Sequence, residues 1–147
     1  MVEKKINDAS NIAAKNCMVT VTLLKVLYTG FDLGSTWSFD ITANEYKKEI
    51  GTKENPVILE LGKATILNSD ITTIEFENGC NKEQAISISV GFEIKEYYDE
   101  DKGMESITFK GKCVHGISNI VNVIKKFGTG KDETTLTFVF QIKCVCR

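Results

Sequence analysis

Regular alternation of apolar and polar residues is the feature that most constrains how this chain can fold. In residues 85–98, AISISVGFEIKEYY, the side chains of Ile86, Ile88, Val90, Phe92 and Ile94 fall on one face, while serine, glycine and charged residues occupy the other. The segment near the C-terminus, TLTFVFQIKCVC, repeats the pattern. A period of two is typical of antiparallel strands with one buried and one solvated face. The sequence therefore predicts long, half-buried strands at both places.

Five further segments share the strand pattern. They are VTVTLLKVLY, WSFDI, VILEL, TTIEF and SITFKGKCV. The first changes phase between Leu23 and Leu24, which indicates a β-bulge or a twist. In the second, Trp37 shares a face with Phe39 and Ile41, so we expect it to belong to the core rather than to a binding surface.

One short amphipathic helix is predicted before the last strand. In GISNIVNVIKKFG, the residues Ile117, Ile120, Val121 and Ile124 follow helical spacing, and Ser118 suits the N-cap. About seven or eight alternating strands with one helix describe two packed sheets. We expect an all-β, antiparallel two-sheet β-sandwich in a single domain covering residues 1–147, with residues 1–16 as an N-terminal arm or a short helix.

Composition and charge argue against nucleic acid and against a membrane span. The chain has 147 residues, a net charge of −2 and 18 basic residues, of which only Arg147 is an arginine. Arginine supplies the planar fork that reads phosphates and guanine edges, so specific nucleic-acid recognition is not expected. The opening MVEKKINDASNIAAKN has no apolar run like that of a signal peptide, and no stretch reaches the length of a membrane span. We expect a cytoplasmic protein without a transmembrane segment.

The five cysteines are odd in number, so they cannot all pair with one another, and reduced thiols are expected. Cys113, His115, Cys144 and Cys146 form two pairs spaced by one residue. On neighbouring strands they could present three thiolates and an imidazole to a zinc ion. The cysteines also continue the apolar faces of their strands, where a thiol packs as a small hydrophobe. Core packing is the preferred interpretation, and zinc binding is the alternative.

Acidic residues gather in two predicted loops. Asp32 follows the first strand, and Asp99, Glu100 and Asp101 follow the strand at 85–98. If consecutive strands alternate in direction, both loops lie at the same end of the sandwich. Their carboxylates could then bind calcium, which takes about six to eight oxygen ligands. Solvated loop tips are the ordinary alternative.

The order of these elements resembles a C2-like sandwich. The resemblance is carried by VTVTLLKVL, the loop YTGFDLGS, the strand WSFDI and the segment SNIVNVIKKF ahead of LTFVFQIKC, with Asp32 and Gly34 as the matching motif residues. It implies a binding domain, with calcium-dependent ligand or membrane binding as one expected activity. The family usually carries S-D-P-Y after that glycine, whereas this chain reads STWSFD, without the aspartate next to the serine and without the proline. Its lysines are scattered, so no basic lipid-binding surface is evident.

No catalytic motif accompanies this architecture. The chain has no phosphate loop, dinucleotide fingerprint or nucleophile elbow, and His115 is its only histidine. We therefore expect no enzyme and no required cofactor. The expected function is a non-catalytic module that binds a protein partner or a second copy of itself; peripheral membrane contact is an alternative. Tyr28, Phe31, Tyr97 and Tyr98 are the predicted contact residues, because aromatic side chains at loop tips are typical of binding hot spots.

Overall fold

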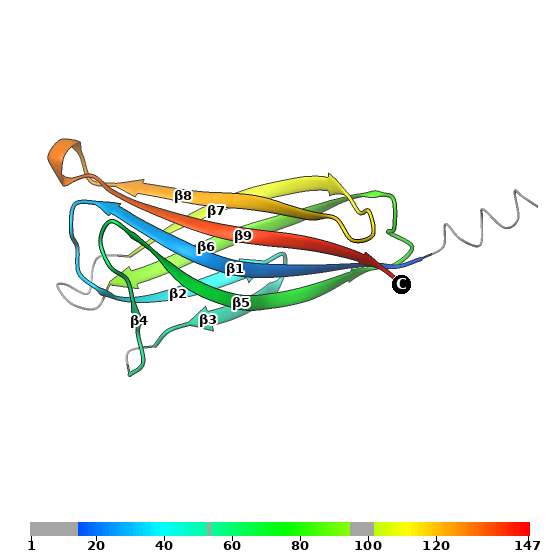
Figure 1. Cartoon of the computed structure of the whole chain (residues 1–147), viewed down its shortest axis with the longest axis horizontal. Coiled ribbons are helices and arrows are strands. Elements are labelled where there is room, and N and C mark those ends of the chain that lie inside the picture. The colour runs from blue at the N-terminus through cyan, green and yellow to red at the C-terminus, as the bar shows by residue number, and fades with distance from the viewer. Residues whose placement is uncertain (1–14, 53, 95–101) are drawn as a thin grey trace, which may run out of the picture.

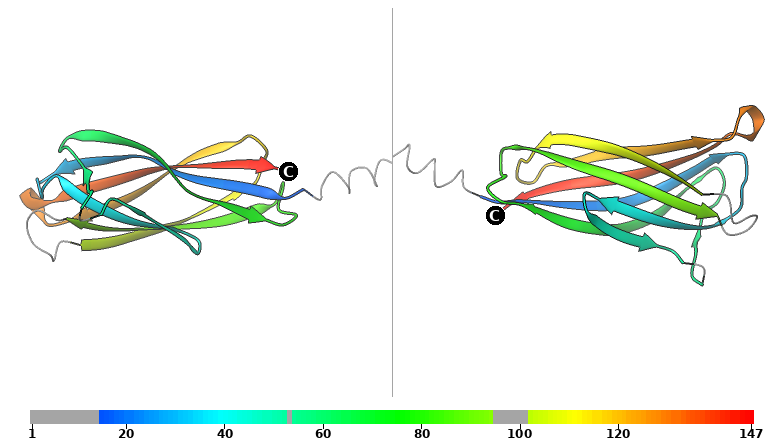
Figure 2. Two further views of the ribbon diagram at one scale, coloured as in Figure 1. Left: turned by 90° about the horizontal axis from the view of Figure 1, so that it is seen from below. Right: turned by 180° about the vertical axis from the view of Figure 1, so that it is seen from behind.

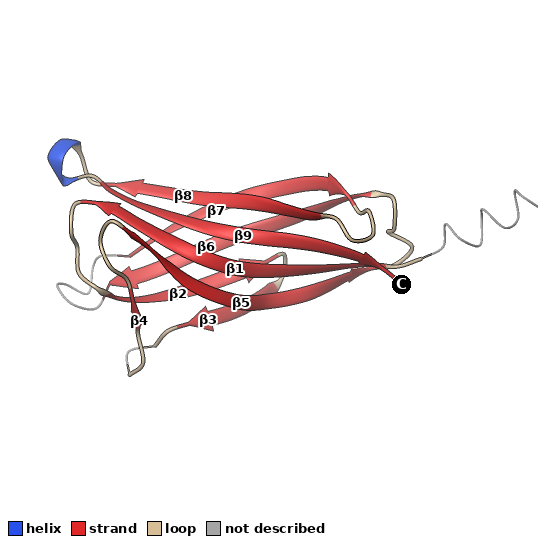
Figure 3. Ribbon diagram, in the orientation of Figure 1, coloured by secondary structure: helices blue, strands red, loops and turns tan. Residues whose placement is uncertain are grey.

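Antiparallel strands make up nearly all the regular structure in the computed structural model (Figures 1 and 3), which describes residues 15–52, 54–94 and 102–147. The nine strands of the described part are β1 (Cys17–Gly30), β2 (Thr36–Ala43), β3 (Tyr46–Ile50), β4 (Val57–Ile58), β5 (Lys63–Phe76), β6 (Glu83–Ile94), β7 (Lys102–Lys112), β8 (Ser118–Phe127) and β9 (Thr134–Cys146). Every pairing between them is antiparallel. The all-β prediction is confirmed.

The strands form two sheets that face each other. Sheet A has the order β5-β1-β9-β8, and sheet B has the order β3-β2-β6-β7 with β4 paired to β2. Figure 2 shows the two sheets as layers that run along the long axis of the molecule. The predicted antiparallel two-sheet β-sandwich is therefore confirmed.

The sandwich has two ends that carry different residues. Cys17 at the start of β1 lies opposite Cys146 at the end of β9, whereas Gly30 at the end of β1 lies opposite Thr134. We call the first the cysteine end and the second the loop end; in Figure 1 they lie at the right and the left. Residues 1–14 of the predicted N-terminal arm are outside the described residues, and Asn16 extends the β1–β9 pairing through two backbone hydrogen bonds with Arg147.

The predicted helix is wrong, because residues 118–127 form strand β8. This strand pairs with β9 along its whole length, from Ser118 opposite Lys143 to Phe127 opposite Thr134. Its β-branched residues favour a pleated strand, since branching at Cβ restricts side chains in a helix. Between β8 and β9 there is a 3-10 turn at Gly130–Asp132. The apolar spacing read as helical arises because both faces of β8 carry isoleucine or valine.

Aromatic side chains join the two sheets in the middle of the core. Trp37 is fully buried, as predicted, and its ring stacks on Phe39 at a centroid distance of 6.4 Å. Phe39 in sheet B meets Phe138 in sheet A edge to face at 5.2 Å. Edge-to-face contacts of this kind add to the energy of simple burial. The Trp37 indole N–H donates to the carbonyl of Gly34, so its polar atom is satisfied.

The predicted irregularity in the first strand is confirmed. The register of β1 shifts between Leu23 and Lys25 against both of its neighbours, β5 and β9. The extra residue is Leu24, and it allows Leu23 and Val26 both to point into the core. An inserted residue changes the face to which all later side chains point, so one bulge reconciles the two apolar phases of β1.

Two disulfides close the cysteine end, and the expectation of fully reduced thiols is therefore wrong. Cys17 is bonded to Cys113, which follows β7, and Cys80 in the β5–β6 loop is bonded to Cys146 at the end of β9. The partners are 96 and 66 residues apart in the sequence. Only the pairing of β1 with β9 and the packing of the sheets bring them together. Cys144 is the free cysteine of the described residues.

Replacing Cys80 and Cys146 together by serine is expected to lower the free energy of unfolding by about 2–4 kcal/mol, because the bond closes a long loop in the unfolded chain. Urea titration followed by tryptophan fluorescence measures this change through buried Trp37. The denaturant slope should rise as well, since the unfolded chain becomes more extended. A loss below about 0.5 kcal/mol, within the range of ordinary surface substitutions, would contradict a structural role for this bond.

Candidate functional site

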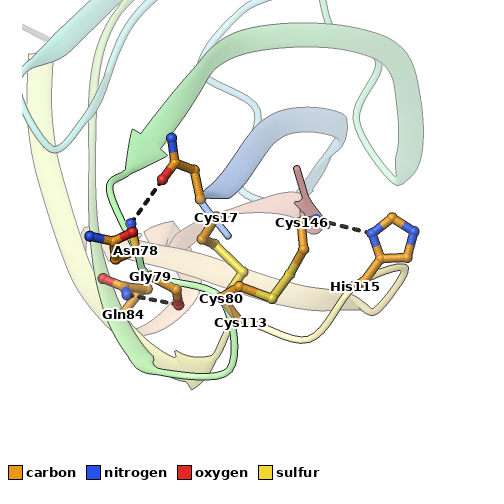
Figure 4. The surroundings of a disulfide bond; sticks show 9 residues. Cys17, Asn78, Gly79, Cys80, Gln84, Cys113, His115 and Cys146 are labelled. Carbon is orange, nitrogen blue, oxygen red and sulfur yellow. Dashed lines mark hydrogen bonds between the residues drawn. A yellow bond between two sulfur atoms is a disulfide. The ribbon is translucent and has the colours of Figure 1, made fainter. Parts of the chain in front are cut away.

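The cysteine end gathers the reactive side chains of the chain in a small volume. Cys17 and Cys146 are opposite each other on β1 and β9, and Val19 is opposite Cys144, so all three cysteines lie on the inner face of sheet A. The partners of the disulfides come from segments outside sheet A: Cys113 follows β7 and Cys80 lies in the β5–β6 loop. Figure 4 shows the two bonds next to each other, with His115 beside Cys146.

A shallow surface cavity of about 330 Å³ opens beside the second disulfide. Its lining residues are Lys15, Cys80, Asn81, Val114, His115 and Cys146. The Nδ1 atom of His115 accepts a hydrogen bond of 3.0 Å from the backbone N–H of Cys146 (Figure 4). Accepting this bond requires an unprotonated Nδ1, so the neutral ring carries its proton on Nε2. The cavity is thus lined by a disulfide and by the imidazole that holds the backbone of Cys146.

The four residues predicted as zinc ligands lie at this end but are not all available as donors. Cys113 and Cys146 are in disulfides and carry no thiolate in this state. The group of metal-binding residue types that comes together in the described chain is a different one. The sulfur atoms of Cys17, Cys113 and Cys144 lie within 4.8 Å of one another, and all three residues are buried. Zinc binding by Cys113, His115, Cys144 and Cys146 stays a prediction.

At the loop end, Tyr28 is buried rather than exposed, although the sequence suggested a contact residue. Its side chain is 1% exposed and packs edge to face on Trp37 at 5.2 Å. The hydroxyl accepts the N–H of Leu33 and donates to Asp32 Oδ1 at 3.0 Å. Burial raises the pKa of Tyr28 to about 12, and the Asp32 carboxylate acts in the same direction. Tyr28 and Asp32 together fix the turn after β1.

Of the remaining predicted site residues, one is described by the structure and five are not. Phe31 is 45% exposed at the loop end, as expected for a contact residue. Tyr97, Tyr98, Asp99, Glu100 and Asp101 lie outside the described residues. The strands on either side of them are described, and Ile94 at the end of β6 is opposite Trp37 near the start of β2. The chain therefore leaves β6 at the same end of the sandwich at which Asp32 lies.

A row of exposed isoleucines on β8 and the turn before it escaped the sequence analysis. Ile120 and Ile124 point outward from β8 with 59% and 46% exposure, and Ile117 in the preceding turn is 47% exposed. Reading the segment as a helix placed all three on its buried side. The alternation of Ile120, Asn122 and Ile124 with Val121 and Val123 could have revealed the strand and its outward face.

One solved structure, described as "Structure of a C2 domain", is similar to this chain with 10% sequence identity and a TM-score of 0.38, over 88% of this chain and 98% of that one. No protein-family model matches the chain, and no curated protein matches it. Within the described residues, no helix is long and apolar enough to cross a membrane.

The raised pKa of Tyr28 leads to a prediction for alkaline conditions. Its value changes from 10.0 to about 12 on folding, so the stability that the neutral hydroxyl contributes is complete below pH 10 and is lost between pH 10 and pH 12. Tyr28→Phe should lower the free energy of unfolding at pH 7 by about 1–2 kcal/mol, since the N–H of Leu33 loses its acceptor. The variant should also lose less stability than the wild type between pH 10 and pH 12.

Denaturant titrations at several pH values test this. Tyr46→Phe is the matched control because Tyr46 is 45% exposed, and its profile should follow the wild type. Equal pH profiles for Tyr28→Phe and the wild type would refute the assignment.

Proposed function

We propose that this chain is a non-catalytic protein-interaction module that associates with a second copy through strand β8. The observation that carries this proposal is the exposed, self-complementary edge formed by residues 120–124. A binding module was expected from the sequence, and the strand arrangement supplies a specific surface for it.

Strand β8 lies at the edge of sheet A and has a strand partner on one side only, β9, among the described residues. An edge strand presents unpaired backbone N–H and C=O groups that can pair with another chain, and soluble proteins usually protect such edges with charges or bulges. On β8, the charged residues are Lys125 and Lys126, near its end. The outward side chains in the middle of the strand are Ile120, Asn122 and Ile124.

Within the part of the chain that the structure describes, a side-chain contact between the two sheets protects the opposite edge of sheet A, and no such hydrogen bond reaches β8. There, the Nζ atom of Lys48 on β3 donates to Ser69 Oγ at 3.1 Å and to the carbonyl of Asp70 at 2.6 Å. Both acceptors belong to β5, the other edge strand of sheet A. A charged side chain therefore ties the edges of the two sheets together, so an incoming strand would have to displace it.

The sequence of β8 fits an antiparallel copy of itself. Residues 120–124 read IVNVI, which is the same in both directions. In a two-fold pairing centred on Asn122, Ile120 would face Ile124 of the second copy, and the two Asn122 side chains would meet at the axis. Lys126 would face Ser118, so the lysines of the two copies stay apart. The pairing would join two copies of sheet A into one continuous sheet.

Three further features support the proposed compartment, the non-catalytic role and the protein interface. Two disulfides are typical of proteins in oxidising compartments, so we propose that the module works there rather than in the reducing cytosol first expected. The lone histidine already uses Nδ1 to hold the backbone of Cys146, which supports a non-catalytic role. The outward isoleucines are apolar, as is typical of the centre of a protein interface.

Charge substitutions at Asn122 test the pairing. Asn122→Lys places two like charges opposite each other at the two-fold axis, so the dimer dissociation constant should rise at least about tenfold. Asn122→Asp alone should raise the dimer dissociation constant in the same way. An equimolar mixture of the two variants should recover the dimer, because each lysine then faces an aspartate. Sedimentation velocity over a range of concentrations measures all three samples.

Ile66→Lys is the matched control, because Ile66 is 62% exposed on β5 at the opposite edge of the same sheet. This variant should dimerise like the wild type. A wild type that stays monomeric at high concentration, or a mixture that fails to recover the dimer, would refute self-association through β8.

Calcium binding at the loop end is a second candidate, and one observation favours it. Because Ile94 is opposite Trp37, the segment that carries Asp99 and Asp101 starts at the end where the exposed Asp32 lies. If these carboxylates bind calcium, excess calcium should raise the thermal midpoint, since a ligand of the native state stabilises that state. Asp99→Asn with Asp101→Asn should abolish the shift, and magnesium at equal concentration serves as the control. An unchanged midpoint with calcium would eliminate this candidate.

A further inference from the structure

A free thiol lies next to a disulfide in the core of the cysteine end. The Sγ atoms of Cys144, Cys17 and Cys113 are within 4.8 Å of one another. Cys17 and Cys113 are bonded together, and Cys144 is free and buried. The three residues come from β1, β9 and the segment after β7, which belong to three different parts of the chain. This arrangement combines a nucleophile and its electrophile at short range.

We propose that Cys17, Cys113 and Cys144 form a thiol–disulfide exchange site, in which the bond between Cys17 and Cys113 converts to a bond between Cys113 and Cys144. The Cys144 thiol loses its proton, and the thiolate attacks Cys113 Sγ. The bond to Cys17 breaks, and the Cys17 thiolate leaves and takes up a proton. One disulfide and one thiol are present before and after the step, so no external oxidant or reductant is consumed.

The backbone around Cys144 favours Cys113 over Cys17 as the atom attacked. The segment after Cys113 runs beside Cys144: Gly116 N–H donates to the Cys144 carbonyl at 2.8 Å, and Cys144 N–H donates to the Ile117 carbonyl at 3.0 Å. The backbone of Val114, the residue next to Cys113, hydrogen-bonds the Cys144 side chain. Cys17 is only a diagonal neighbour of Cys144 across the β1–β9 pair, a position from which disulfides form poorly.

Burial controls how readily the site reacts. It raises the pKa of the Cys144 thiol, and the hydrogen bond from the backbone of Val114 opposes this effect. Most of the thiol is therefore protonated at neutral pH, which makes exchange slow and keeps Cys144 from reacting with solutes. The disulfide within reach of Cys144 is therefore the bond between Cys17 and Cys113.

Exchange would change which strand holds the two sheets together. The bond between Cys17 and Cys113 ties β1 of sheet A to the segment that follows β7 of sheet B. After exchange, the same segment is tied to β9 instead, and the free thiol lies at the start of β1. There it is opposite Cys146, which belongs to the second disulfide. The site involves neither β8 contacts nor metal, so its test is independent of the proposed self-association.

Peptide mapping without reduction reads the pairing directly. Cleavage after lysine leaves Cys144 and Cys146 together on the peptide CVCR. The original pairing gives two linked species, one joining the peptides of Cys17 and Cys113 and one joining that of Cys80 to CVCR. Exchange instead gives a single species of three peptides, containing Cys80, Cys113 and CVCR, with Cys17 free. Fragmentation of that species locates the bonds at Cys144 and Cys146.

The protein is equilibrated with a mixture of reduced and oxidised glutathione at about pH 8.5, near the ordinary pKa of a thiol, and then quenched with acid. In the variant Cys17→Ser, oxidised glutathione should convert Cys113 and Cys144 almost completely into the three-peptide species. In the wild type, the same species should be detectable as a minor fraction. The variant Cys144→Ala is the control, and it should never give the three-peptide species.

Two results would overturn the proposal. One is a folded Cys17→Ser variant in which Cys113 and Cys144 stay free or are capped separately by glutathione. The other is a wild type that lacks the three-peptide species after equilibration. The wild-type measurement decides alone if circular dichroism shows that Cys17→Ser does not fold. In Cys113→Ser, the bond between Cys17 and Cys144 should form less completely than the bond between Cys113 and Cys144 forms in Cys17→Ser. The opposite order would contradict the attack on Cys113.

Discussion

The antiparallel pairing of β1 with β9 is the interaction on which the rest of the sandwich depends. The two strands stay paired from Cys17 opposite Cys146 to Gly30 opposite Thr134, interrupted by a single bulge. Their inward side chains form the centre of the core in sheet A, and β5 and β8 are added on either side of them. The pair joins segments far apart in the sequence, so its loop-closure entropy is high and must be offset by burial. The pairing also brings the cysteines together.

Local alternation made much of this fold predictable, and its failures have a common physical cause. The strands β6 and β9 and the bulge in β1 follow from a period of two, which is a property of neighbouring residues. In β8, Ile120, Val121 and Ile124 have helical spacing, but a strand with apolar residues on both faces produces the same spacing, and only pairing with β9 decides between the two. Tyr28 shares the inward face of Val26, so alternation alone predicts its burial, whereas its position next to a loop predicts a contact residue; the structure follows the alternation.

The candidate sites were less predictable, because they depend on contacts between distant segments. An odd number of cysteines leaves at least one outside the internal disulfides, and Cys144 is such a residue. The partners of the other four follow from sheet order and register, which no spacing in the sequence encodes. The three sulfur atoms that come together include that of Cys17, the first cysteine in the sequence. The spacing of the four predicted zinc ligands gave no reason to consider it.

Strand β9 takes part in both proposed sites, the thiol–disulfide exchange site and the open edge at β8. It carries Cys144 and Cys146 at its end, and it is the strand that holds β8 in sheet A. Neither disulfide includes a residue of β8, so another strand can be added at that edge without any change in the covalent bonds. Moving the bond of Cys113 from β1 to β9 would brace the partner of β8 directly against sheet B. The proposed exchange and the open edge therefore share strand β9, although they use different residues of it: Cys144 lies near its end, and the pairing with residues 120–124 of β8 lies along its middle.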